Sequence, residues 1–365
     1  MNSRSSLMML AALVAVPVMA RGGDLRDPAP DDSKAAANIS VPSAPSPWRV
    51  GASYAPFLGL KTTFSGLGRF NSPFTPQPLG GGQNRDYDDG FVHVDSSGPN
   101  SGGTWNWGYQ NNSQYNPAGD GSISFSITNS QSNASAEERN GAQGFELMAY
   151  RDLGPIEWAT VSARKSTWGL RGGFQYGRVE VGNHDFLSAS AVTTTDTFGL
   201  GGSSPAGAPY SGSFSGWGVV LDDNPTRTTT SNGQAIVSGT RDLESDLFIA
   251  NFGPYFQIPV TDHFDVTLEA GVSLAVASGS YDYLSSTSLG VLGTQVSRGS
   301  GSDTSFLPGL YVGLSGIYQL NEKWALQGSG RYQYMESFEI SAGGSQAELS
   351  FDSAFVVSFG VLYSF

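Results

Sequence analysis

The sequence predicts an all-β protein, a closed antiparallel transmembrane β-barrel with an even number of strands. Three observations predict it: an apolar run near the start that indicates export, several segments that alternate apolar with polar or small side chains, and a last strand with one aromatic face. Successive side chains of a strand point to opposite faces, so one face can meet lipid while the other meets water or the interior.

Residues 1–20 have the features of a signal peptide. Arg4 precedes an apolar run from Leu7 to Ala20, which is about fourteen residues long and too short to cross a bilayer as a helix. No later segment approaches the roughly eighteen consecutive apolar residues of a membrane helix. A mature chain in a membrane is therefore expected to cross it as a barrel, in which every backbone polar group is satisfied.

Residues 21–47 are rich in Pro, Ala and Asp and show no periodicity. We expect a disordered periplasmic linker here, because such a composition has no apolar face to bury. The barrel is then predicted to occupy residues 48–365.

Composition excludes several classes of function. The chain has 0 Cys, which excludes disulfides, thiolate metal sites and a lipid-modified cysteine. A mean hydropathy of −0.19 is compatible with a membrane barrel, because only every second residue faces lipid. The formal net charge of −13 argues against nucleic acid as a partner.

Four strand starts share a short polar turn followed by an aromatic residue, at Trp48, Trp168, Phe264 and Trp324. Such a ring at the first outward position of a strand is stable at the membrane interface. Residues 264–277 form the clearest strand, apolar at even positions and often polar at odd ones. We therefore expect hairpins joined by short periplasmic turns, with long external loops on the other side.

The number of strands is open between about eight and about twelve, and parity requires it to be even. We favour twelve, because a face formed by Ile123, Phe125 and Ile127 would be costly to leave in water. Five segments are counted as wall strands in that case: 91–95, 104–110, 121–129, 144–151 and 156–163. Three segments rich in Gly, Ser, Thr or Pro are expected to be external loops: 65–86, 188–240 and 285–302.

The last eleven residues place six large side chains on one strand face, ending on the terminal aromatic residue Phe365. This pattern resembles the assembly signal at the C-terminus of bacterial outer-membrane β-barrels of the porin-like superfamily, and the resemblance covers residues 48–365. It implies the cell outer membrane as the location after export, with outer-membrane lipid and the barrel-assembly machinery as partners. The residues implied as the signal are Phe359, Val361, Tyr363 and Phe365.

Alternation also predicts which polar side chains face the lumen. They are Glu146, Arg171, Gln175, Asn251, Glu269, Gln327, Arg331 and Gln333. In a narrow barrel such groups fill the interior, whereas in a wide one they line water. With twelve strands we expect a passive or weakly selective pore for small solutes or ions. The alternative is a non-conducting surface barrel whose loops have a structural, adhesive or partner-binding role.

A remote alternative is an outer-membrane hydrolase with a site at the rim. His93 with Asp95, or His184 with Asp185, could supply a base, but neither pair has an identifiable nucleophile. We therefore expect no enzyme and no catalytic residues.

Two acidic segments, 86–89 and 222–224, could donate oxygen ligands to Ca²⁺, but neither has the spacing of an EF-hand loop. We expect no metal site and no cofactor.

Overall fold

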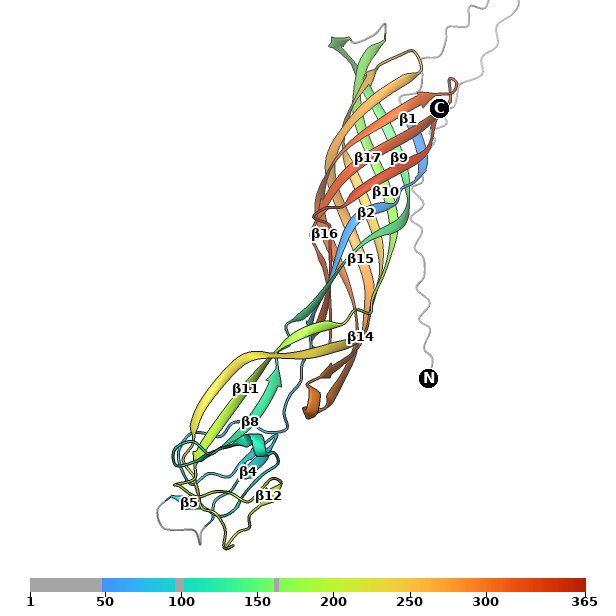
Figure 1. Ribbon diagram of the computed structural model, residues 1–365. Helices are drawn as coiled ribbons and strands as arrows, with labels where there is room; N and C mark the ends of the chain where they lie inside the picture. Colours follow the sequence, from blue (N-terminus) through green and yellow to red (C-terminus); the bar gives the residue numbers. More distant parts are fainter. Residues whose placement is uncertain (1–47, 96–101, 161–163) are drawn as a thin grey trace, which may run out of the picture. The chain divides into compact units, whose positions relative to one another are not determined.

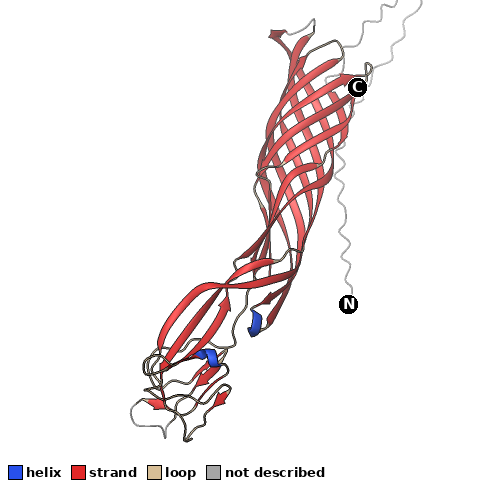
Figure 2. Ribbon diagram, viewed as in Figure 1, coloured by secondary structure: helices blue, strands red, loops and turns tan. Residues whose placement is uncertain are grey.

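The computed structural model describes residues 48–95, 102–160 and 164–365. The predicted signal peptide and linker lie outside these residues. The fold is all-β (Figure 1, Figure 2), and its two helices are single 3-10 turns, η1 (Asn112–Gln114) and η2 (Gly290–Leu292). No helix in the described ranges is long and apolar enough to cross a membrane.

Eight antiparallel strands form a ring in which each strand is hydrogen-bonded to two others. In ring order they are β1 (Trp48–Tyr54), β9 (Ala134–Thr160), β10 (Lys165–Asn183), β14 (Thr226–Pro259), β15 (Phe264–Ser288), β16 (Thr294–Gln319), β17 (Trp324–Met335) and β20 (Phe355–Ser364). Strand β1 pairs with β9 on one side and with β20 on the other. Turns 260–263 and 320–323 lie at the same edge as the paired ends of β1 and β20, where the Ser364 backbone N–H donates to the Lys323 carbonyl over 2.8 Å.

The ring has eight strands, the lower end of the predicted range, rather than the favoured twelve. Segments 144–151 and 156–163 were counted separately, but residues 134–160 form the single strand β9, which continues through Gly154 at a positive φ of 145°. Segment 121–129 is a strand, β8 (Ser122–Ser130), but it pairs with β11 (Leu187–Gly199) and lies outside the ring. Its apolar face is buried in a cluster of its own, so it needs no place in the wall.

Several segments that we expected to be loops are strands. Strands β15 and β16 continue to a tight connection, where Ser288 is paired with Thr294, so most of 285–302 is extended. In 188–240, β11 pairs with the first part of β14. The Ser- and Thr-rich composition that suggested loops also suits strands with two solvated faces. Further strands extend the wall: β2 (Phe57–Leu67), β18 (Phe338–Ala342) and β19 (Ser345–Ser350).

The outward face of the ring is apolar. On β15 the even residues Leu268, Val272 and Leu274 are exposed, whereas Glu269 and Ser273 between them are buried. Trp48, Trp168 and Trp324 are exposed near the edge that carries the short turns. Apolar side chains that point away from a folded interior are the arrangement of a surface covered by lipid.

The remaining strands, which neither belong to the ring nor extend its wall, form a second region with its own core, which we call the loop subdomain. It contains β8 and β11 together with β3 (Arg85–Tyr87), β4 (Gly90–Val92), β5 (Gly103–Thr104), β6 (Trp107–Tyr109), β7 (Tyr115–Asn116), β12 (Tyr210–Ser211) and β13 (Leu221–Asp222). Trp107, Phe125 and Phe198 are fully buried in its apolar cluster. The Tyr87 ring stacks on Phe125 at a centroid distance of 5.2 Å.

Candidate functional site: the interior of the strand ring

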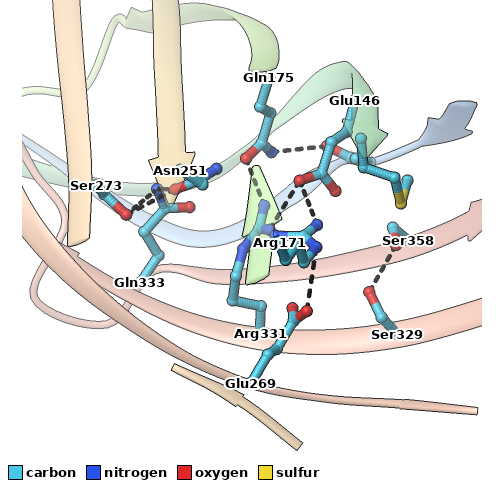
Figure 3. Close-up of polar contacts among 12 residues, drawn as sticks. Glu146, Arg171, Gln175, Asn251, Glu269, Ser273, Ser329, Arg331, Gln333 and Ser358 are labelled. Atoms are coloured by element: carbon cyan, nitrogen blue, oxygen red, sulfur yellow. Dashed lines mark hydrogen bonds and ion pairs between the residues drawn. The ribbon is translucent and has the colours of Figure 1, made fainter. Parts of the chain in front are cut away.

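The inward face of the ring carries the eight polar side chains that the alternation predicted. All eight are at most 3% exposed. They come from β9, β10, β14, β15 and β17, and all except Gln327 contact at least one other of the eight (Figure 3). Their assignment as the lining of a lumen that crosses a membrane stays a prediction.

The central layer is an ion-pair network of two arginines and two glutamates. Glu146 Oε1 accepts hydrogen bonds from Arg171 Nη2 over 2.6 Å and from Arg331 Nη1 over 2.8 Å. Arg171 Nε forms an ion pair with Glu269 Oε2 at 3.1 Å, and Arg331 Nη2 donates to Gln175 over 2.7 Å. The four formal charges sum to zero, so each buried charge has a compensating partner inside the ring.

Polar contacts continue on both sides of this layer. Toward the short turns, the Tyr150 hydroxyl accepts a hydrogen bond from Gln327 over 2.8 Å. Beyond it, Arg49 donates to Gln257 over 2.8 Å. On the other side, Ser273 donates to Asn251 over 2.7 Å, and Gln333 donates to Ser273 over 3.1 Å. Side chains therefore link strands across the interior that are not paired through their backbones, such as β9 and β17.

The interior becomes apolar farther from the short turns. On β14, Asn251 is followed at alternate buried positions by Ile249 and Leu247, and on β15, Ser273 is followed by Ala275 and Ala277. These residues belong to one buried cluster with side chains from β2 and β18. This apolar part was not predicted from the sequence, although a signal was present: in β14 and β15, both faces of the strand become apolar here.

The rim residues considered for catalysis have other partners. His93 Nε2 lies 2.8 Å from Asp86 Oδ1, whereas Asp95 accepts a hydrogen bond from the Ser215 backbone over 3.2 Å. Asp185 accepts a hydrogen bond from Asn183 over 3.2 Å. The geometry therefore joins His93 to a carboxylate other than the one predicted.

The acidic segment at 86–89 has a structural role in the loop subdomain. Asp88 accepts a hydrogen bond from the Thr128 backbone over 2.7 Å, and Asp89 accepts one from the Ser126 backbone over 2.9 Å. The two carboxylates thus cover the edge of β8. Burial raises the pKa of Asp89 to about 6, against the opposing effect of its backbone hydrogen bonds.

The buried Tyr87 and Asp196 and the half-buried Arg227 form a hydrogen-bonded group in the loop subdomain. The Tyr87 hydroxyl donates to Asp196 over 2.7 Å, and Arg227 binds both oxygens of that carboxylate over 2.6 and 2.7 Å. Burial, and then the hydrogen bond to Asp196, raise the pKa of Tyr87. The hydrogen bonds to the Asp196 carboxylate also raise the pKa of the Arg227 guanidinium.

The assembly-signal residues lie on β20 and at the chain end. Phe359 and Phe365 are exposed, and the Tyr363 ring contacts Trp324 at a centroid distance of 5.0 Å. Their role in assembly stays a prediction.

Solved structures of two bacterial proteins are similar to this chain. One is Ail, the attachment invasion locus protein of Yersinia pestis, in complex with the heparin analogue sucrose octasulfate, with 9% identity, a TM-score of 0.24, and coverage of 86% of this chain and 99% of the other. The second is the outer membrane protease OmpT from Escherichia coli, with 10% identity, a TM-score of 0.32, and coverage of 87% and 96%. No family model matches the sequence, and no curated protein matches it.

The eight-strand antiparallel ring agrees with the resemblance of the sequence to bacterial outer-membrane β-barrels, and no particular family is identified. The prediction that the chain is not an enzyme is wrong as an exclusion, because a protease is among the similar structures. At this degree of similarity, neither protein assigns an activity to the chain.

Proposed function

We propose that this chain is an outer-membrane β-barrel that does not conduct and that carries the loop subdomain as a partner-binding surface. In this proposal the eight-strand ring is a closed barrel, the short turns face the periplasm, and the loop subdomain is external. The apolar outward face of the ring and its exposed tryptophans support a lipid environment.

The filled interior is the observation that carries the proposal. An eight-strand barrel is just wide enough for side chains to fill, and here the charges on Glu146, Arg171, Glu269 and Arg331 are buried and paired. The adjoining apolar cluster would present a second barrier to ions, because its side chains are mostly hydrocarbon and cannot replace the hydration of an ion. The pore predicted from the sequence depended on a wider barrel of twelve strands.

The separate core of the loop subdomain supports a role in binding. Ten buried side chains in this cluster include Trp107 and Phe125, so the region is held by packing as well as by its connections to the ring. Binding residues are often found on loops that a rigid scaffold positions.

Conductance in a planar lipid bilayer tests the proposal. We expect the purified protein, inserted at a density measured by labelling, to produce no discrete current steps under voltage. A porin of known conductance, inserted in the same bilayers, is the positive control. Reproducible steps that change in size or ion preference with Glu269→Gln would contradict the filled interior and favour the pore.

A further inference from the structure

Two neighbouring tryptophans of the loop subdomain, the half-buried Trp105 and the exposed Trp217, form an aromatic surface that we call the tryptophan ledge. Their ring centroids are 6.2 Å apart with an interplanar angle of 31°. Trp217 is 98% exposed, whereas Trp107, two residues after Trp105, is fully buried. The subdomain therefore places Trp107 in its core and presents Trp217 to solvent, with the half-buried Trp105 beside it.

The segment that carries Trp217 is anchored on both sides. The Gly212 backbone N–H donates to the Trp107 carbonyl over 2.8 Å, and the Trp107 indole donates to the Val219 carbonyl over 2.8 Å. Between these points, the Ser215 backbone N–H donates to Asp95 over 3.2 Å. Such anchoring lowers the ordering cost of binding to the ledge, because the segment is already held.

The charges of the loop subdomain favour a cationic partner. The chain has no lysine between Lys61 and Lys165, or between Lys165 and Lys323. Arg85 is 1% exposed and donates to backbone carbonyls, and Arg227 is bound by Asp196.

Exposed carboxylates, by contrast, lie in the same subdomain as the ledge. Asp222 is exposed and is paired in register with Gly103, two residues before Trp105. Asp86 is also exposed. A lysine or arginine over an indole face gains from the ring's negative electrostatic potential, and nearby carboxylates add to this attraction.

We propose that the tryptophan ledge binds a basic, arginine- or lysine-bearing segment of a partner protein. This inference rests on the proposed function, because it names the partner class of the external surface. An anionic partner would be repelled by the exposed acids, and a neutral sugar would gain from the rings but not from Asp222.

Binding of a fluorescein-labelled hexa-arginine peptide to the full chain in detergent micelles tests the inference. We expect saturable binding that weakens as salt rises, because the Debye length shortens. Trp217→Ala should weaken it about two- to fivefold, the range for an exposed cation–π contact. Phe186→Ala, which removes another exposed aromatic ring outside the ledge, is the matched control and should leave the affinity unchanged.

A second pair of variants separates the ledge from the general acidity of the chain. Asp222→Asn should weaken binding at low salt, whereas Asp303→Asn, at an exposed acid on β16, should have a smaller effect. Equal affinity of the wild type and Trp217→Ala would overturn the inference, as would saturable binding of maltohexaose without binding of hexa-arginine. Conductance is a separate readout: a conducting protein that keeps Trp217-dependent binding would contradict only the filled interior.

Discussion

In both the ring and the loop subdomain, strand residues alternate between polar and apolar side chains. The middle of the ring buries the polar face of its strands, whereas the loop subdomain buries the apolar face. Midway through the ring, charged side chains such as Arg331 and Glu146 are inside and leucines such as Leu268 are outside. In the loop subdomain, Phe125 and Trp107 are inside, whereas acids such as Asp86 and Asp222 are outside. This difference shows that alternation defines the two faces of a strand, while the packing partners and the solvent or lipid around the strand decide which face is buried.

The largest effect should follow from opening the charged layer of the ring. Arg331→Ala leaves Glu146 with one arginine partner and Gln175 without its donor. We expect a loss of about 4–5 kcal/mol in the free energy of unfolding, because a buried charge loses its compensation. Urea titration in detergent measures it. Lys61→Ala, which removes an exposed pair with Glu137, is the control and should cost no more than about 1 kcal/mol.

A slightly smaller effect should be confined to the loop subdomain. Phe125→Ala removes a fully buried ring from its cluster, and we expect a local loss of about 3–4 kcal/mol from the lost burial and the cavity. Hydrogen exchange read by mass spectrometry should show faster exchange in β8 and β11 and unchanged protection in β15 and β16. Equal loss of protection in both regions would show that the two cores fold as one unit.

A charge on the outward face of the ring tests its lipid surroundings. Leu268→Arg should destabilise the inserted protein by about 2–4 kcal/mol if the residue lies near the membrane midplane. Asp282→Arg, at an exposed polar position farther along β15, should have little effect. Unfolding titrations in lipid vesicles compare the two variants, and equal tolerance would contradict a lipid-facing ring.

The smallest effect should be a pH dependence of the loop subdomain. The folded pKa of Asp89 is about 6, above its ordinary value, so the folded state holds this proton more tightly than the unfolded state. Stability from this group is therefore greatest at pH 4 and falls as pH rises to about 6, by about 1 kcal/mol once solvent screening is considered. Asp89→Asn should remove the trend in β8 hydrogen exchange, corrected for intrinsic rates; an unchanged trend would assign it to another group.

Local pattern predicted much of the ring. Strands β1, β15 and β17 begin at Trp48, Phe264 and Trp324, the aromatic positions that the sequence analysis identified. The burial of Glu269 and Arg331 also follows from parity along a strand, because each residue two positions away shares its face. These features depend on residues that are close together in the sequence, so they can be predicted from one sequence alone.

Pairing between distant segments decided the rest. The apolar pattern of Ile123, Phe125 and Ile127 was visible, but its cover comes from Tyr87, Phe198 and other residues far along the chain. Without those partners, the face suggested a place in the membrane wall and led to too many strands. A strand's own alternation contains no information on which segment will bury it.

The sequence by itself determined that this protein is built from alternating strands and which side chains share a face, because side-chain direction along a strand has a period of two residues. Only the tertiary structure decided that the ring has eight strands, that Glu146 pairs with both Arg171 and Arg331, and that the interior becomes apolar beyond Asn251. The physical reason is that ring size and ion pairing depend on contacts between residues more than a hundred positions apart, as for Glu146 and Arg331, separated by 185.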